Sequence, residues 1–134
     1  MGKLRPRSGT TTVEFAVVIS IFLLFVLGLV EIGRGFMVSH LLTNAARVGC
    51  RQGILQNQST ASITSAVDAL LATQGVQGAM TTVQVNGITA DASTARSNDD
   101  ITVSVSAPIA SLTWVPVSNY LQGNISGQYT LRRE

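Results

Sequence analysis

The strongest pattern in the chain is an uncharged, almost wholly apolar run from Phe15 to Val30. Its roughly thirteen Phe, Val, Ile and Leu residues favour membrane insertion by about 4 to 8 kcal/mol, because each contributes roughly 0.3 to 0.6 kcal/mol. Glu14, at the leading edge of the run, opposes insertion by at most about 3 kcal/mol. The apolar contribution is larger, so residues 10–32 are predicted to form a transmembrane helix.

The same helix is expected to continue beyond the membrane. No proline interrupts the sequence between Phe15 and Gly53, and a glycine commonly ends a helix. A helix from about Thr11 to about Gln52 is roughly 60 Å long, about twice the thickness of the hydrocarbon layer. Residues 33–53 are therefore predicted to form a projecting helical stem.

Small residues recur along this helix, and small residues let helices approach one another closely in membranes. They are predicted to be helix-packing positions: Gly28, Gly33, Gly35, Ala45, Ala46 and Gly49. Two interpretations stay open. Either the helix packs against helices of other chains, or the stem packs only against its own domain.

Residues 54–134 are predicted to form one small extracytoplasmic α+β domain. Apolar residues from Ile63 to Leu71 follow a helical spacing, which predicts a second, short helix. Three later segments alternate apolar and polar residues: 81–85, 101–107 and 125–131. With the turn signal Asn86-Gly87, they predict a small three-stranded antiparallel sheet. Trp114 is expected in the core, and Arg132 to Glu134 are expected to be a solvated terminus.

Residues 1–9 form a basic leader ahead of the span. Lys3, Arg5 and Arg7 carry its charge, and it contains no acidic residue. The positive-inside rule then predicts a cytoplasmic N-terminus and a C-terminal domain outside the membrane. The net charge of +2 depends on this leader, so it does not indicate nucleic-acid binding.

The residues around the leader resemble type IV pilin-like proteins. In that family a prepilin peptidase cuts after a glycine, and a glutamate stands fifth in the mature chain. Gly9 and Glu14 have this spacing, which makes Thr10 the mature N-terminus. Three blocks, Gly9–Ala16, Glu31–Arg34 and Thr43–Arg51, resemble more specifically the TadE-like minor pseudopilins of tight-adherence pilus systems. That family usually has a small residue such as alanine where Cys50 stands.

The resemblance implies a non-enzymatic structural or assembly component of a tight-adherence pilus or a related secretion apparatus, with a pilin-like fold. It implies an inner-membrane location in a bacterium, and it leaves open whether the protein enters a cell-surface pilus or only assists at its base. Its expected partners are other pilin-like subunits, the prepilin peptidase, inner-membrane platform proteins and membrane lipid. Glu14 is expected to neutralise the Thr10 amine of a neighbouring subunit, because a buried charge is tolerated only when paired. Within the stem, Glu31 is expected to pair with Arg34.

Two other hypotheses remain. The chain could be an uncleaved single-pass adapter or assembly chaperone with an extracytoplasmic binding domain, with Glu14 serving only as a helix-start acid among lipid headgroups. A membrane-tethered enzyme is the third hypothesis, but no catalytic motif supports it. We therefore expect no enzyme activity, cofactor, small-molecule substrate or nucleic-acid partner.

Few residues suggest metal or thiol chemistry. His40 is the only histidine and Cys50 the only cysteine, so no metal site and no internal disulfide are expected. His40 is expected on the helix surface. Cys50 is expected to be a packing residue, with an intermolecular crosslink as its alternative. Asp99 and Asp100 form a pair of acidic residues, for which a solvated turn before a strand is the simplest interpretation. Asp91 and Asp99 could alternatively supply calcium ligands.

Overall fold

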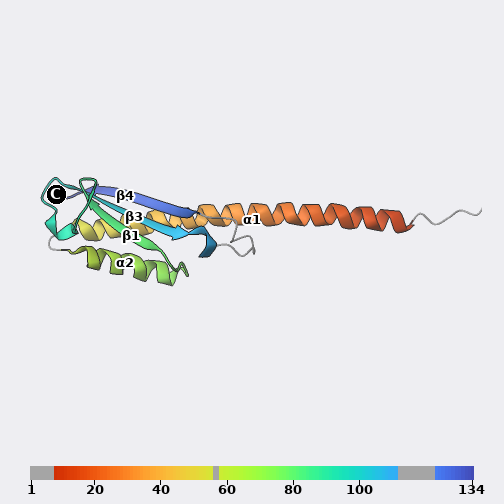
Figure 1. The fold of residues 1–134 in the computed structure, drawn as a ribbon, viewed down its shortest axis with the longest axis horizontal. Coiled ribbons are helices and arrows are strands. Elements are labelled where there is room, and N and C mark those ends of the chain that lie inside the picture. Colours follow the sequence, from red (N-terminus) through yellow and green to blue (C-terminus); the bar gives the residue numbers. More distant parts are fainter. Residues whose placement is uncertain (1–7, 56–57, 112–122) are drawn as a thin grey trace, which may run out of the picture. The chain divides into compact units, whose positions relative to one another are not determined.

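The computed structural model describes residues 8–55, 58–111 and 123–134. The chain divides into two units, residues 1–34 and residues 35–134, which are described separately below. Helix α1, Ser8–Gly53, contributes to both units; it begins three residues earlier and ends one residue later than the sequence predicts (Figure 1). Most of the basic leader lies outside the described residues, as does Trp114.

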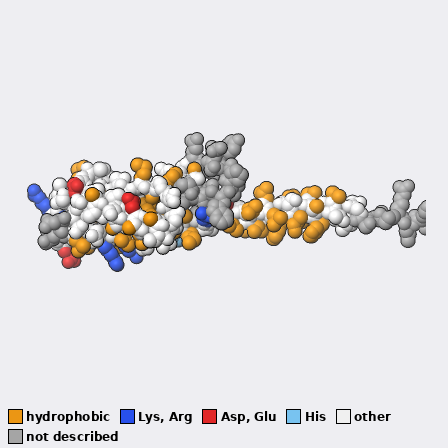
Figure 2. All heavy atoms as spheres, turned by 90° about the horizontal axis from the view of Figure 1, so that it is seen from below, with side chains coloured by type: hydrophobic (Ala, Val, Ile, Leu, Met, Phe, Trp, Pro, Cys, Tyr) orange, Lys and Arg blue, Asp and Glu red, His pale blue; other side chains and the backbone are white. Residues whose placement is uncertain are grey.

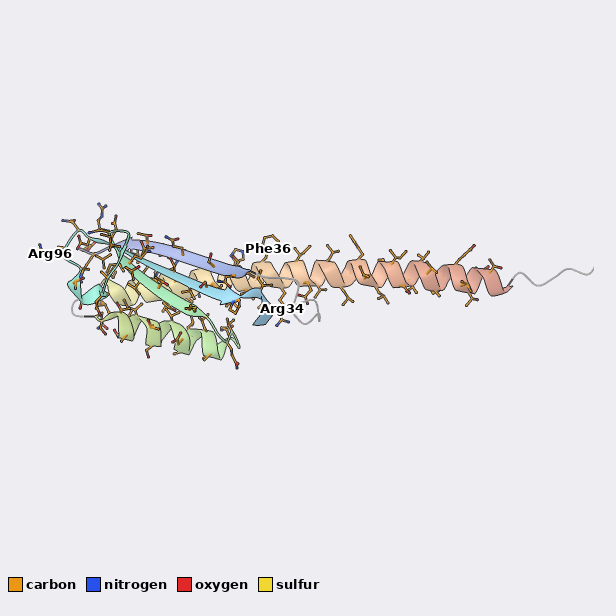
Figure 3. All side chains as sticks on the ribbon, viewed as in Figure 1. Arg34, Phe36 and Arg96 are labelled. Carbon is orange, nitrogen blue, oxygen red and sulfur yellow. The ribbon has the colours of Figure 1, made fainter. Side chains whose placement is uncertain are left out.

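The first unit consists of the N-terminal part of α1, and its apolar side chains point outward on every side (Figures 2 and 3). Leu24 is 75% exposed and Phe15 64% exposed. Among the described residues, α1 is the one helix that is long and apolar enough to cross a membrane, with a mean hydropathy of 2.8 in its most apolar window. This unit therefore fits a single-pass membrane protein.

The second unit is an α+β domain in which the C-terminal part of α1 and helix α2, Thr60–Thr73, cover one face of an antiparallel sheet (Figure 1). The strands are β1 (Met80–Val85), β2 (Ile88–Thr89), β3 (Asp100–Pro108) and β4 (Asn124–Arg132), in the order β2-β1-β3-β4. Two short 3-10 helices, η1 (Ala92–Thr94) and η2 (Ile109–Ser111), lie on either side of β3 in the sequence.

The sheet has four strands, so the prediction of three strands was one short. Asn86 and Gly87 both have positive φ angles, 52° and 80°, which allow the tight two-residue turn of a hairpin. The turn places Ile88 opposite Val85 and creates the two-residue strand β2. Two residues are too few for an alternating pattern to be recognised in the sequence.

The core lies between the two helices and the inner face of the sheet. The predicted helical positions Ile63, Val67 and Leu71 of α2 are buried. They meet inward-facing residues of the central strand β3, such as Val103 and Val105, which are also buried. The helical and the alternating patterns of the sequence thus come together in one apolar layer.

Close backbone packing joins β4 to α1. Gly127 is buried on β4, and a β-carbon at this position would overlap the backbone of Leu42 and Thr43. Only glycine lets the strand approach the helix this closely. Gly127 therefore sets the distance between α1 and the last strand.

The expectation of a solvated terminus is wrong for Arg133. Its guanidinium group is buried and donates hydrogen bonds to three backbone carbonyls. The acceptors are Leu55 (3.1 Å), Ala92 (3.3 Å) and Ala95 (2.8 Å). Arg133 therefore ties the end of β4 to the segment after α1 and to the loop around η1.

Candidate docking helix and processing site

The predicted processing site lies at the exposed beginning of α1. Gly9, Thr10 and Glu14 are all exposed, and no atom lies within 4 Å of the position that a β-carbon at Gly9 would take. Thr10 and Glu14 are four residues apart, which places them on neighbouring positions of one helix face. The structure gives the Glu14 carboxylate no hydrogen bond or ion pair with any residue that it describes.

A shallow hollow of about 460 Å³ lies on the surface of α1 one turn further on. It is lined by the short side chains of Thr12, Ala16 and Ser20, which recur every four residues, and by Val13, Val17 and Ile21. The Ser20 hydroxyl turns inward and donates a hydrogen bond to the Ala16 carbonyl oxygen at 2.8 Å. Short side chains at this spacing let another helix approach closely. The predicted packing positions were glycines and later alanines, so this surface was not among them.

The six predicted helix-packing residues fall into two groups. At Gly28, Gly33 and Gly35, no described atom outside the neighbouring residues and the backbone of α1 lies within 4 Å of the position that a β-carbon would take. Ala45, Ala46 and Gly49 are buried in the chain's own domain. A β-carbon at Gly49 would lie 2.9 Å from a methyl group of Val67 on α2. For these three residues the structure favours the interpretation that the stem packs against its own domain.

The two charged residues at the end of the first unit, Glu31 and Arg34, are half-buried. Their proposed ion pair stays a prediction. Arg34 is shown in Figure 3. Both residues follow the apolar run directly, where charged side chains reach the membrane–water interface.

The lone thiol is part of the core. Cys50 is fully buried, and its S–H group donates a hydrogen bond to the Tyr129 carbonyl oxygen at 3.1 Å. Burial raises the pKa of the Cys50 thiol, partly offset by the backbone N–H groups of Val103 and Leu131. A buried, protonated thiol is inert. The structure therefore favours the interpretation of Cys50 as a packing residue over that of an intermolecular crosslink. His40 is exposed on α1, as predicted.

The acidic residues of the loops hold local structure. Asp91 accepts a hydrogen bond from the Ser93 N–H at 2.9 Å and caps η1. Asp99 accepts hydrogen bonds from the Arg96 N–H at 2.7 Å and from the Asn86 amide at 2.8 Å. These bonds lower the pKa of both carboxyl groups, and they agree with the solvated-turn interpretation.

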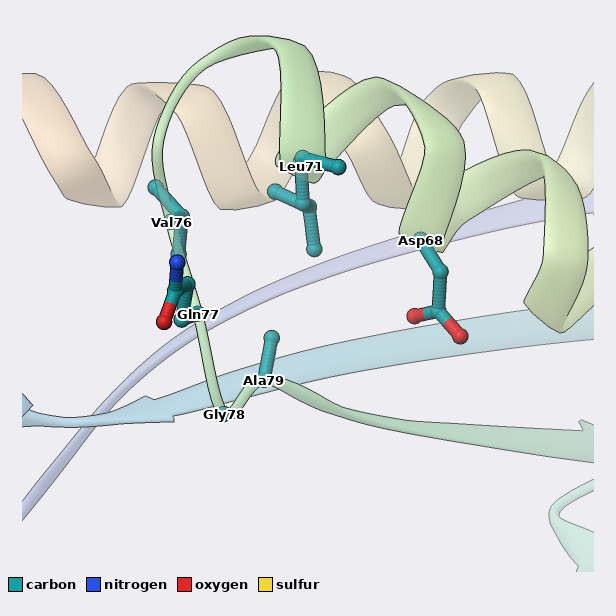
Figure 4. Close-up of a pocket in the computed structure, with 7 residues that line it drawn as sticks. Asp68, Leu71, Val76, Gln77, Gly78 and Ala79 are labelled. Carbon is teal, nitrogen blue, oxygen red and sulfur yellow. The ribbon is translucent and has the colours of Figure 1, made fainter.

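A second hollow, of about 380 Å³, lies between the end of α2 and the loop that follows it (Figure 4). Asp68 contributes the one carboxylate of its lining and Gln77 the one side-chain amide, beside apolar residues such as Leu71 and Val76. Across the described part of the chain, no group of three or more His, Cys, Asp or Glu residues could hold a metal ion. This hollow therefore offers no grouping of catalytic side chains.

The observation that connects these features with known proteins concerns α1. A protein-family model described as TadE-like protein matches residues 9–51. Residues 9–51 are TadE-like. The TadE-like segment begins at Gly9, includes Glu14 and ends two residues before the end of α1. Neither a curated protein nor a solved structure matches the chain significantly.

The match associates the chain with the tight-adherence pilus system. TadE-like proteins are typically structural components rather than enzymes. A family of this pilus system suggests interaction with other components of the system. The C-terminal domain beyond residue 51 lies outside the match, and its role is inferred from the structure alone.

Proposed function

We propose that this protein is a minor pseudopilin, a structural or assembly component of a tight-adherence pilus that is processed after Gly9. The observation that carries the proposal is the start of the TadE-like segment at Gly9, five residues before an exposed glutamate at the head of an apolar helix. The basic leader favours a cytoplasmic N-terminus and a C-terminal domain outside the inner membrane.

Cleavage gives the proposed docking step its chemistry. Removal of the leader creates an α-amino group on Thr10, and this amine is positively charged at neutral pH. The Glu14 carboxylate then neutralises the Thr10 amine of a neighbouring subunit. Both charges lie at the apolar end of the helix, so only a subunit with the correct stagger pairs them. The hollow at Thr12, Ala16 and Ser20 allows the neighbouring helix to approach.

Partners follow from the same proposal. The prepilin peptidase recognises the leader, and the neighbouring helices belong to other pilin-like subunits. Inner-membrane platform proteins hold the assembly, with lipid around the apolar surface of α1. The open positions Gly28, Gly33 and Gly35 provide further places for close helix contacts.

N-terminal sequencing of the protein from bacterial membranes tests the processing step. We expect the mature chain to begin at Thr10. A Gly9→Val variant should keep the leader, and it should insert and fold normally because no atom crowds this position. An intact Met1 terminus in the functional wild-type protein would contradict processing and favour the uncleaved adapter.

Glu14→Gln tests the pairing step. The variant should insert and be processed, but its incorporation or its support of pilus formation should fall at least about tenfold, because breaking a buried ion pair costs several kcal/mol. Pilus yield measured by shearing and immunoblotting gives the readout. Glu31→Gln is the matched control, since it removes an acid at the other end of the run. Normal piliation in the Glu14→Gln strain would exclude the pairing mechanism.

A further inference from the structure

Strand β4 leaves one edge of the sheet unpaired. Among the residues that the structure describes, β4 pairs only with β3. Hydrogen bonds at both ends of this ladder join Ile109 N–H to Gly123 O at 3.0 Å and Arg133 N–H to Asp99 O at 2.9 Å. In an antiparallel ladder, hydrogen-bonded and non-hydrogen-bonded residue pairs alternate. The odd-numbered residues of β4 therefore form the hydrogen bonds with β3. The even-numbered residues turn their N–H and C=O groups outward, and all are exposed: Asn124, Ser126, Gln128, Thr130 and Arg132.

Within the described residues, β4 itself has few of the features that block strand addition. Its register with β3 is regular over all nine residues, without a bulge. It contains neither proline nor lysine, the residues that commonly block such edges. The opposite edge of the sheet ends in the two-residue strand β2, where Ile88 is 71% exposed. The β4 edge therefore exposes backbone N–H and C=O groups, and the β2 edge exposes an apolar side chain, which a partner would cover.

The two edges are complementary when two copies stand side by side in the same orientation. β1 and β4 run in the same direction because each is antiparallel to β3, and β2 runs in the opposite direction. The β2 strand of one copy would therefore lie antiparallel to β4 of the next. This is the more stable way to pair two strands.

The rows of the sheet set the register of this contact. Val85 lies opposite Ile88 on one side and Ile101 on the other, and Ile101 lies opposite Leu131. When the two copies stand at the same height along the strand direction, Ile88 of one copy therefore lies opposite Leu131 of the next. In the adjacent row, Thr89 likewise meets Thr130. The exposed Ile88 side chain thus lies beside the half-buried Leu131 side chain. The Thr89 hydroxyl group likewise lies beside the Thr130 hydroxyl group.

The backbone groups also match in this register. The Asn86 N–H bonds to the Asp100 carbonyl at 2.8 Å, so even-numbered β1 residues face β3 and Val85 faces β2. Ile88 opposite Val85 then bonds within the hairpin, and Thr89 turns its N–H and C=O outward. Thr130 also turns its N–H and C=O groups outward on β4, so Thr89 of one copy and Thr130 of the next form a hydrogen-bonded pair.

We propose that β4 of one copy pairs with β2 of a second copy, so that the sheets continue from copy to copy. The inference rests on the proposed function only in requiring that neighbouring copies share one membrane. Two β4 strands paired antiparallel would not meet this requirement, because the part of α1 in the domain runs alongside the strands (Figure 1) and would point in opposite directions. The β4–β2 contact keeps all α1 helices parallel. It uses two different surfaces, so it does not close at a dimer.

Cysteine crosslinking of the full-length protein in bacterial membranes tests the contact. The double variant Thr89→Cys/Thr130→Cys replaces two exposed residues, and the native Cys50 is buried. In a hydrogen-bonded antiparallel pair the two Cα atoms are about 5.5 Å apart, within reach of a disulfide. Mild oxidation should give a ladder of dimers, trimers and larger species. Each single variant should give no ladder.

A matched control places the second cysteine two steps of the ladder away. Thr89→Cys/Ser126→Cys also replaces exposed residues, but position 126 lies about 13 Å along β4 from position 130, so no ladder is expected. Dimers from Thr130→Cys alone would show two β4 strands pairing. Such dimers, the absence of oligomers, or rungs that contain a different polypeptide would each overturn the proposal.

The outcome is separable from that of the pseudopilin proposal. A Thr10 N-terminus and Glu14-dependent piliation without a ladder would leave the function intact and overturn the strand pairing. A ladder formed by a protein that keeps its leader would support the pairing and contradict the processing.

Discussion

At the residue scale, Arg133 shows how a charged side chain can hold a small domain together. Its guanidinium is buried beside three backbone carbonyls from two separate segments. Its neighbour Arg132 instead forms an exposed ion pair with Asp100 at 2.9 Å. The two arginines are adjacent in sequence but alternate between the faces of the strand, so their contributions to stability should differ strongly.

Replacing these two arginines by methionine separates the contributions. Arg133→Met leaves three carbonyls without their charged donor and should lower the free energy of unfolding by about 3 kcal/mol. Arg132→Met breaks only an exposed pair and should lower it by less than about 1 kcal/mol. Chemical denaturation in detergent micelles, followed by circular dichroism, measures both. Equal losses of unfolding free energy would show that the buried hydrogen bonds of Arg133 stabilise the fold no more than the exposed ion pair of Arg132.

At the scale of elements, the sequence predicted α1, α2 and the three longer strands because each has a clear period of apolar residues. β2 is absent from that prediction because it is only two residues long. The alternating pattern placed Gly127 in a strand, but nothing in it revealed that the strand crosses the backbone of α1. The hollow around Ala16 was also missed, since it arises from short side chains that are not glycines. Periodicity predicts which face is buried, but not how closely two elements approach.

Gly127→Ala tests the closest approach between elements. The added methyl group overlaps the backbone of α1, which cannot move aside as a side chain can. We expect a loss of about 1 to 3 kcal/mol in the free energy of unfolding, typical of overpacking. Ser126→Ala, on the exposed face of the same strand, should change it by no more than about 0.5 kcal/mol. Thermal unfolding in micelles compares the two, and similar midpoints would show that β4 can shift away from α1.

At the scale of the whole molecule, the charges of the C-terminal domain make its stability depend on acid. A hydrogen bond from the Arg132 side chain lowers the pKa of the Asp100 carboxyl group below its usual value of 3.8. Backbone and Asn86 hydrogen bonds lower the pKa of Asp99 in the same way. A group whose pKa is lower in the folded state stabilises the fold above its unfolded pKa and loses this effect as pH falls through the folded pKa.

The domain should therefore keep this contribution at neutral pH and lose it below about pH 4. Asp99→Asn removes one of the titrating groups, so the drop in thermal midpoint between pH 7 and pH 3 should be smaller than in the wild type. Asp68→Asn removes an exposed carboxylate on α2 and serves as the control. An equal acid sensitivity of all three proteins would exclude the hydrogen bonds of Asp99 as a cause.

The contact between Gly127 and the backbone of α1 also bears on the order of events during synthesis. The ribosome produces α1 first and β4 last, so the apolar side of the stem emerges long before the strands that will cover it. Contacts between such distant parts of a chain form slowly, and uncovered apolar surface promotes aggregation in the meantime. Anchoring the first segment in the bilayer would hold each newly made chain apart from its neighbours until the last strand arrives.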